Sequence, residues 1–333
     1  MNRQLAFYKL GERVASTLPT RLALKLGQGL GAAVGRLPDW DHRRALVASH
    51  IQRLVGADLG PRATKRLVAE VFGYYGRYWA ESLRLPSLSL AEVAAGVEMT
   101  GFDNVQRCLA GGKGLLIAAP HLGGWEWGAM YLAASRGLPM TVAVEPLAPP
   151  ELFDWFAHYR QRLGMHVVSV GPGAAGQIMR ALREGHIVCL LSDRLVAGTA
   201  GVTVDFFGAA TRLPAGPVTL ALRSGSPLLA AAIYYGAGVG AHHIVFRPPL
   251  ELARSGNLRA DVQAGTQALA TELEHLIRAA PTQWHLFQPN WPGDPSLRVR
   301  SRSRPQGPVS PAGQGPRVGA RRLGTATAAQ AGK

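Results

Sequence analysis

The sequence has few cysteines, and it lacks an unbroken apolar run long enough to cross a bilayer. Only two cysteines occur among 333 residues, Cys108 and Cys189, and both lie in apolar stretches. Buried thiols of this kind argue against a disulfide framework or a zinc–thiolate site, and they favour a reducing compartment. The apolar stretch at 226–241 is too short to span a bilayer. Charged residues interrupt the first thirteen positions, where a signal peptide would need a continuous apolar core.

Acidic residues are also scarce, with 21 Asp and Glu against 36 Lys and Arg, so the formal net charge is +15. Residues 297–333 contain eight Lys and Arg and no acidic residue, so they contribute a charge of +8. The preceding 296 residues carry the remaining net charge of +7. A basic protein attracts phosphate, either on nucleic acid or on anionic lipid, and composition does not choose between them. The hydrophobic content of 47% indicates a globular protein with a substantial core.

Hydrophobic periodicity divides the chain into three parts. Residues 1–95 are expected to be helical, and basic residues alternate with apolar ones along the first 37 positions. This pattern is typical of helices that lie in a lipid interface, although a helical hairpin packed on the domain with its basic side in water would show it too. Residues 96–295 are expected to form an α/β core, and residues 296–333, rich in Arg, Gly, Pro and Ser, a disordered basic tail.

In the core, short apolar runs alternate with helical segments. This alternation predicts an α/β fold in which a largely parallel or mixed sheet is covered by helices on both faces. The helical region before it would bind a membrane. Strands are predicted at 114–119, 140–144, 166–170, 187–192, 202–207, 228–235 and 243–247, and helices at 64–83, 124–134, 150–163, 174–184, 216–223 and 261–279.

The most informative segment, His121-Leu-Gly-Gly-Trp-Glu126, directly follows the first core strand. Catalytic groups collect beyond the carboxyl ends of parallel strands, and Glu126 in the first turn of the next helix could face His121. The carboxylate would then hold one tautomer of the imidazole, whose free nitrogen would act as a general base. A plain loop histidine or a phosphate ligand at the helix start would share this spacing. A metal site is disfavoured, because no second His or Cys lies at ligand spacing.

The His-x4-Glu segment resembles the His-x4-Asp/Glu block of the glycerolipid acyltransferase superfamily. Further segments in the same order are similar to the branch that contains the lipid A biosynthesis acyltransferases and the phosphatidylinositol mannoside acyltransferases. They are Ser192-Asp193-Arg194, Val204-Asp205-Phe-Phe-Gly208, Arg212-Leu-Pro-Ala-Gly-Pro217 and Trp284-His285-Leu-Phe-Gln288-Pro-Asn-Trp291. The resemblance covers about residues 5–295.

The resemblance implies that an acceptor hydroxyl attacks the thioester of an acyl-CoA or an acyl carrier protein. His121 would remove the hydroxyl proton and Glu126 would orient His121. Backbone N–H groups near Gly123 and Gly124 are candidates for stabilising the oxyanion. Acyl-CoA would be a substrate, and no metal or other cofactor would be required.

Acidic candidates for substrate binding follow from the same resemblance. Glu145 ends a predicted strand and could bind sugar hydroxyls of the acceptor, or it could be a surface carboxylate. Asp193 could bind such hydroxyls too, or form an internal salt bridge with Arg194. Asp205 could be a second acidic partner of His121.

Three arginines are the candidates for binding phosphate. Arg160 lies on a predicted helix and could anchor a phosphate of the acceptor or of CoA, or be an ordinary solvated arginine. Arg194 ends a strand, and Arg212 resembles a phosphate-binding position.

The predicted reaction is acyl transfer from acyl-CoA to a mannose hydroxyl of a phosphatidylinositol mannoside, a phosphoinositide-type glycolipid. The protein is expected to bind an anionic membrane surface peripherally, at the cytoplasmic face of a bacterial plasma membrane. One alternative is a lipid A precursor or another glycolipid as acceptor. Another is a basic nucleic-acid-binding protein, although the core lacks any motif for base recognition, so no specific nucleic acid is expected.

Overall fold

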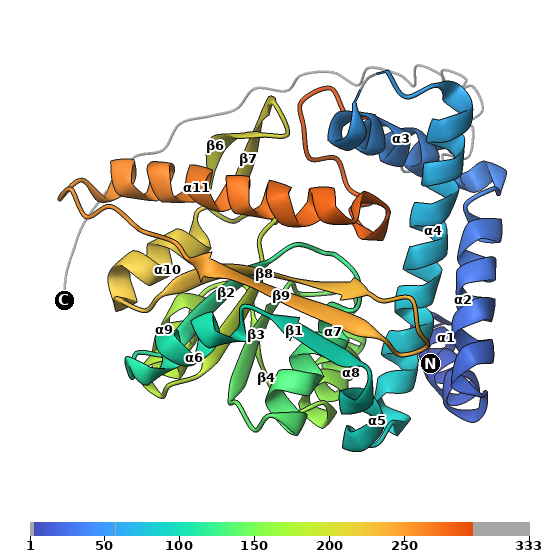
Figure 1. The fold of residues 1–333 in the computed structure, drawn as a ribbon, viewed down its shortest axis with the longest axis horizontal. Coiled ribbons are helices and arrows are strands. Elements are labelled where there is room, and N and C mark those ends of the chain that lie inside the picture. The colour runs from blue at the N-terminus through green and yellow to red at the C-terminus, as the bar shows by residue number, and fades with distance from the viewer. Residues whose placement is uncertain (1–2, 57, 296–333) are drawn as a thin grey trace, which may run out of the picture. The chain divides into compact units, whose positions relative to one another are not determined.

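The computed structural model describes residues 3–56 and 58–295, and the predicted disordered tail lies outside these residues. A seven-stranded sheet has the order β1-β9-β8-β2-β5-β3-β4 (Figure 1). The five strands from β8 to β4 are parallel, whereas β9 runs antiparallel to β8 and pairs in parallel with β1. The predicted α/β class with a mostly parallel sheet is confirmed. The strands are β1 (Val97–Thr100), β2 (Leu115–Ala119), β3 (Met140–Val144), β4 (Met165–Ser169), β5 (Ile187–Leu191), β8 (Leu228–Tyr235) and β9 (His242–Pro249).

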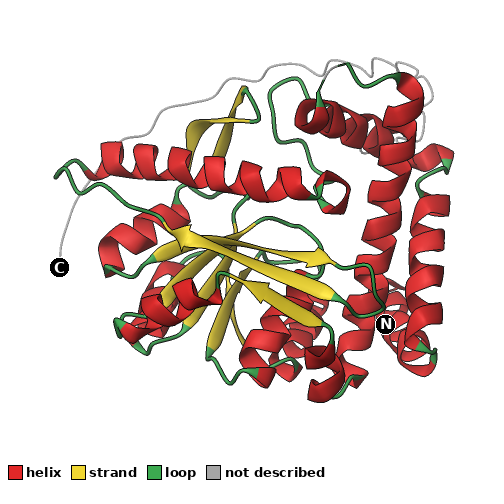
Figure 2. Cartoon of the chain, in the orientation of Figure 1, coloured by secondary structure: helices red, strands yellow, loops and turns green. Residues whose placement is uncertain are grey.

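Helices pack on both faces of this sheet, as Figure 2 shows in red. The α-helices of the described residues are α1 (Arg3–Thr17), α2 (Thr20–Val34), α3 (Asp41–Val55), α4 (Pro61–Arg84), α5 (Leu90–Ala95), α6 (Phe102–Ala110), α7 (Trp125–Met130), α8 (Pro150–Arg162), α9 (Ala174–Arg183), α10 (Gly216–Ser224) and α11 (Leu258–Ala279). A π-helical turn, Tyr131–Ser135, continues α7. Short 3-10 helices are Pro38–Trp40, Leu85–Ser87 and Pro281–Gln283.

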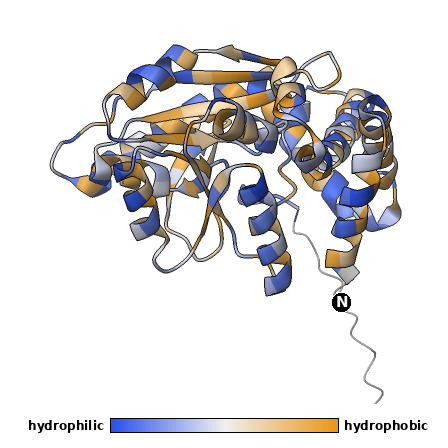
Figure 3. Cartoon of the chain, turned by 90° about the horizontal axis from the view of Figure 1, so that it is seen from below, coloured by the Kyte–Doolittle hydropathy of each residue, from blue (hydrophilic) through white to orange (hydrophobic). Residues whose placement is uncertain are grey.

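Strand β2 shows how the sheet divides the core, because all five of its residues are buried. Leu116 and Ala118 join the apolar cluster formed with α9, α10 and α11, whereas Leu115 and Ile117 join the cluster formed with α6, α7 and α8. Alternate residues of a strand point to opposite faces, so a strand covered on both faces must be apolar throughout. Figure 3 shows the strands mainly in the hydrophobic colour and the helices in both colours.

The N-terminal region is helical, but its first apolar stripe belongs to two helices. Pro19 precedes the first residue of α2 and lacks a backbone N–H, so the chain turns there instead of extending α1. Helix α2 then packs closely along α4 (Figure 1). A Cβ atom on Gly31 of α2 would lie 2.9 Å from the Cα of Gly76 on α4, so the two backbones approach without intervening side chains.

A separate two-stranded hairpin consists of β6 (Gly201–Phe206) and β7 (Ala209–Pro214). Phe207 and Gly208 form its turn, both with positive φ, as in the turns that match the twist of paired strands. The side chains of Gln263 and Gln267 on α11 hydrogen-bond to the backbone of β6, which covers an edge that would otherwise be unpaired. The sequence predicted β6 but neither β7 nor β1.

Candidate active site

The register of the central sheet brings together two side chains that lie 72 residues apart in the chain. In the parallel pair of β2 and β5, Ala119 is the partner of Leu191. His121 and Asp193 therefore each lie two residues beyond partnered strand ends, at the same edge of the sheet. The backbone N–H of Ser192 donates to the carbonyl of Ala119 at 2.9 Å, which continues the pairing toward the site.

His121 and Asp193 form a hydrogen-bonded pair. The Nδ1 atom of His121 lies 2.6 Å from Oδ1 of Asp193, and the backbone N–H of His121 donates to Oδ2 at 2.9 Å. The Asp193 side chain is fully buried, whereas that of His121 is 25% exposed. Burial raises the pKa of the Asp193 carboxyl, but the charge and hydrogen bonds of His121 and the hydrogen bond of Trp284 outweigh it, so the pKa lies below its usual value.

This geometry fixes the chemistry that the imidazole can perform. An ionised Asp193 accepts a hydrogen bond from a protonated Nδ1 of His121. In the neutral imidazole the free lone pair then lies on Nε2. Within residues 3–56 and 58–295, no group hydrogen-bonds to Nε2 of His121, and the side chain is partly accessible. His121 can therefore act as a general base whose charged form Asp193 stabilises.

The segment at 284–290 hydrogen-bonds to both members of this pair. The indole N–H of Trp284 donates to Oδ2 of Asp193 at 2.7 Å, and the side chain of Asn290 donates to the Asp193 carbonyl at 3.0 Å. The backbone N–H of His285 donates to the carbonyl of His121 at 2.7 Å. Burial, with a smaller contribution from nearby His121, lowers the pKa of His285 to about 3, so this side chain is neutral at ordinary pH.

Gly123 is required by the turn that follows His121. Gly123 has a φ of 59°, and a Cβ atom there would collide with the carbonyl oxygen of Ile233. The N–H of Gly123 donates to the carbonyl of Gln283 at 3.0 Å, so the expected role of this N–H as an oxyanion donor is wrong for the described conformation.

Glu126 does not contact His121, which corrects the predicted pairing. Its side chain is 2% exposed, and its carboxylate accepts hydrogen bonds from Ser82 at 2.6 Å and from Arg160 at 2.8 Å. Glu126 lies in the first turn of α7, where its carboxylate is bonded to α4 through Ser82 and to α8 through Arg160. Burial, followed by the charge of Glu126, raises the pKa of Tyr78 well above its usual value.

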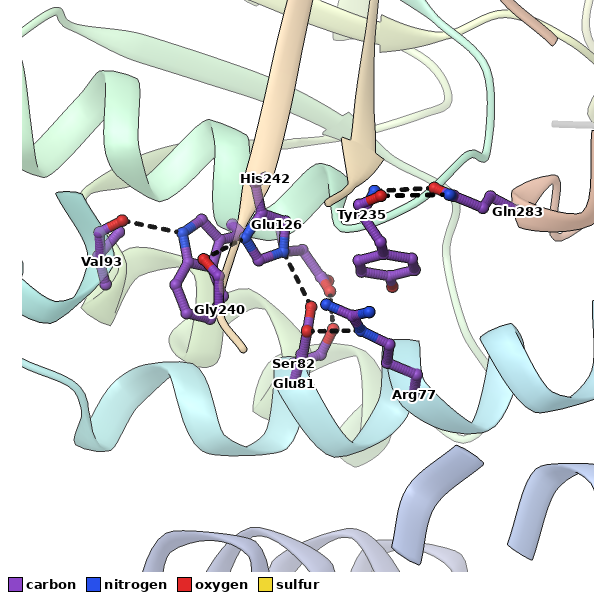
Figure 4. Close-up of polar contacts among 10 residues, drawn as sticks. Arg77, Glu81, Ser82, Val93, Glu126, Tyr235, Gly240, His242 and Gln283 are labelled. Atoms are coloured by element: carbon purple, nitrogen blue, oxygen red, sulfur yellow. Dashed lines mark hydrogen bonds and ion pairs between the residues drawn. The ribbon is translucent and has the colours of Figure 1, made fainter. Parts of the chain in front are cut away.

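A second buried polar group lies beside Glu126 (Figure 4). The Glu81 carboxylate contacts Arg77 at 2.9 Å and Nε2 of His242 at 3.0 Å. The Arg77 guanidinium also lies over the ring of Tyr235, 4.2 Å from its centroid. These contacts join α4 to the last residue of β8 and the first residue of β9.

Arg160 and Arg194 are both paired with carboxylates. The side chain of Arg160 is 9% exposed and its charge is matched by Glu126, so it is not the solvated arginine considered from the sequence. Arg194 contacts Glu145 at 2.6 Å, because β5 and β3 are neighbours and both residues follow their carboxyl ends. Asp193 and Arg194 therefore do not form the internal salt bridge considered from the sequence.

Asp205 and Arg212 lie on the hairpin, and no contact joins either of them to His121 within the described part of the chain. The Asp205 carboxylate accepts the N–H of Gly208 at 3.0 Å, so it caps the hairpin turn and is not the second acidic partner of His121. Arg212 donates to the carbonyl of Gly201 at 2.9 Å and lines a shallow cavity with Arg259.

Among residues 3–56 and 58–295, no group of three or more His, Cys, Asp or Glu side chains is arranged to hold a metal ion. None of the helices that the structure describes is long and apolar enough to pass through a membrane.

Comparison with known proteins identifies the family of the chain. The sequence matches a family model described as bacterial lipid A biosynthesis acyltransferase over residues 6–292. It is 35% identical over 296 residues to the phosphatidylinositol mannoside acyltransferase of Mycobacterium tuberculosis, covering 82% of this chain and 90% of that protein. It is 32% identical over 302 residues to the protein of the same name from Mycolicibacterium smegmatis, covering 89% and 93%.

A more distant relative is the lipid A biosynthesis acyltransferase of Haemophilus influenzae, 27% identical over 191 residues and 56% of each chain. The family match spans both carboxyl-edge residues, His121 and Asp193, and the C-terminal segment up to residue 292. The chain belongs to the bacterial lipid A biosynthesis acyltransferase family.

Proposed function

We propose that this protein transfers a fatty acyl chain from acyl-CoA to a mannose hydroxyl of a phosphatidylinositol mannoside. The observation that carries the chemical part of the proposal is the hydrogen bond between Nδ1 of His121 and Asp193. The His121 side chain is 25% exposed, and its Nε2 has no hydrogen-bond partner among the residues that the structure describes. The acceptor is inferred from two relatives with this name that are 35% and 32% identical over most of the chain.

In the proposed reaction, Nε2 of His121 removes the proton from the acceptor hydroxyl as its oxygen attacks the thioester carbonyl. Asp193, which remains ionised because its pKa is lowered, stabilises the imidazolium that forms. When the tetrahedral intermediate collapses, the C–S bond breaks and His121 returns its proton to the leaving thiolate, which gives CoA. Glu126 has a supporting role, because it neutralises buried Arg160 behind the site.

Replacing His121 with alanine is expected to lower kcat by at least about 10³-fold, because the general base is removed. Wild-type and His121→Ala proteins would be incubated with radiolabelled acyl-CoA and phosphatidylinositol mannoside, and transfer and CoA release would be followed. Full activity in the variant would disprove the mechanism. Transfer by the wild type to a lipid A precursor but not to the mannoside would disprove the acceptor.

We further propose that α1 and α2 bind an anionic membrane surface at the cytoplasmic face. Three exposed apolar side chains follow one face of each helix at spacings of three or four residues, which is the helical repeat. Basic side chains on the same helices are exposed beside them, and such a pairing of apolar and basic groups suits a layer of anionic head groups. The apolar residues are Phe7, Leu10 and Val14 on α1, and Leu22, Leu26 and Leu30 on α2; the basic residues are Lys9, Arg13, Arg21 and Lys25.

The double variant Leu26→Glu/Leu30→Glu is expected to bind anionic liposomes at least about 10-fold more weakly, because two inserted side chains are lost and two negative charges are added. Co-sedimentation with vesicles of defined anionic lipid content would measure this. The matched control is Leu258→Glu on α11, a leucine that is similarly exposed at 42%. Equal binding by all three proteins would exclude this surface as the membrane contact.

A further inference from the structure

The Asp193 carboxylate is held by donors of two different kinds. Two of its hydrogen bonds come from His121 itself, through Nδ1 and the backbone N–H. The third comes from the indole N–H of Trp284, 2.7 Å from Oδ2. Among the side chains of residues 3–56 and 58–295, Trp284 is therefore the only donor outside His121 that hydrogen-bonds to this carboxylate.

The backbone of Trp284 is attached to the same loop that carries His121. Residues Leu122 and Trp284 form an isolated antiparallel bridge. On either side of it, the N–H of His285 donates to the carbonyl of His121 and the N–H of Gly123 donates to the carbonyl of Gln283. The backbone of this tryptophan thus aligns with the histidine loop, while its indole reaches the partner carboxylate.

We propose that Trp284 is a positioning residue for the acyl transfer proposed above, because it sets the distance and orientation between Asp193 and His121. The side chain is suited to this function, since it is 3% exposed and its ring packs between His50 and Phe207. A rigid, buried donor fixes the second carboxylate oxygen, so Oδ1 stays aligned with Nδ1 of His121. This inference depends on the proposed function only for its kinetic test.

The chain contains a matched control in Trp291, seven residues further on. This tryptophan is 4% exposed, and its indole N–H donates at 3.0 Å to the backbone carbonyl of Phe206. Trp284→Phe and Trp291→Phe therefore remove the same donor and a similar ring area from the same segment, but only the first loses a contact with Asp193.

Trp284→Phe is expected to lower kcat about 10-fold or more while KM stays within about twofold, because only the stabilisation of the transition state is weakened. A less well-aligned carboxylate stabilises the imidazolium less, so the acid limb of the kcat/KM profile should move to lower pH. Trp291→Phe should leave kcat and the position of this limb unchanged within about twofold. The titratable side chain that faces the pair is His285, and it stays neutral over this pH range because its pKa is lowered to about 3.

A second measurement does not need activity. The titration of His121 would be followed by NMR in protein with labelled histidine, and the spectrum of His121→Gln would assign its signal. Its midpoint should move to lower pH in Trp284→Phe and stay in place in Trp291→Phe. If the wild type transferred no acyl group, the proposed function would fail, yet this titration would still decide the effect of Trp284 on His121.

Two outcomes would overturn the inference. One is identical kinetics and titration in the two phenylalanine variants. The other is a shift of the acid limb to higher pH, which would mean that Trp284 only withdraws charge from the carboxylate. If Trp284→Phe failed to fold, benzothienylalanine at position 284 would keep the ring shape without the N–H, and the same criteria would apply.

Discussion

Asp193→Asn is expected to lower kcat for acyl transfer by about 10³-fold or more, nearly as much as the loss of His121 itself. An amide carries no negative charge, so the imidazolium would form without stabilisation. The amide NH2 could also face Nδ1 and hold the histidine proton on Nε2, where the base must be free. Because the pKa of Asp193 lies below its usual value, its carboxylate stays ionised at neutral pH and can stabilise the imidazolium.

The chain offers a second His–Asp pair as a control. His50 lies 3.1 Å from Asp294, and both side chains are buried. Asp294→Asn should reduce stability while lowering kcat by less than about 10-fold, since Asp294 makes no contact with the reacting groups. Steady-state assays on the folded fraction would compare the two variants. Similar kcat values for Asp193→Asn and wild type would show that His121 does not depend on this carboxylate.

Removing Glu126 should act mainly on stability. Glu126→Ala is expected to reduce the free energy of unfolding by about 3–5 kcal/mol, because the Arg160 charge would stay buried without a partner. Ser82 would also lose the acceptor of its 2.6 Å hydrogen bond. Urea titration followed by tryptophan fluorescence would measure the loss.

Two comparisons test whether the unpaired Arg160 charge causes the loss of stability. The double variant Glu126→Leu/Arg160→Met removes both charges at similar volume, so it should recover most of the lost stability. Glu272→Ala breaks an ion pair with Arg247 in which both side chains are about 30% exposed, and it should cost less than about 1 kcal/mol. A small loss in Glu126→Ala, comparable with that of Glu272→Ala, would mean that the buried pair contributes little.

The histidine of the site was predictable from the sequence, whereas its partner was not. His121 follows an apolar run that had to be a buried strand, so its place at a carboxyl edge was expected. The sequence pairs His121 with Glu126 instead, because Glu126 lies in the first turn of the next helix and because the segment resembles the His-x4-Asp/Glu block. Asp193 was recognised at another strand end, but its contact with His121 depends on β5 being the neighbour of β2. Strand order is a property of the whole sheet, and local periodicity does not contain it.

The resemblance indicated the C-terminal segment, whereas the contact of this segment with His121 and Asp193 was not predicted. Trp284 and Asn290 lie in a segment with little regular secondary structure, so no periodicity pointed to them, although the density of aromatics there was a usable signal. Strands β1 and β7 were missed because Val97–Thr100 is short and Ala209–Pro214 has few β-branched or aromatic residues. The broad architecture was recovered because every central strand is a continuous apolar run.

The close contact of α2 with α4 at Gly31 and Gly76 has a mechanical consequence. The backbones of α2 and α4 touch there with no side chain between them, so a shift of one helix at this point displaces the other. Helix α4 also hydrogen-bonds to the α/β core, through Ser82 to Glu126 and through Glu81 to His242. If α2 lies on a membrane surface as proposed, α4 connects that surface to the buried contacts of Glu126 and His242 at the core.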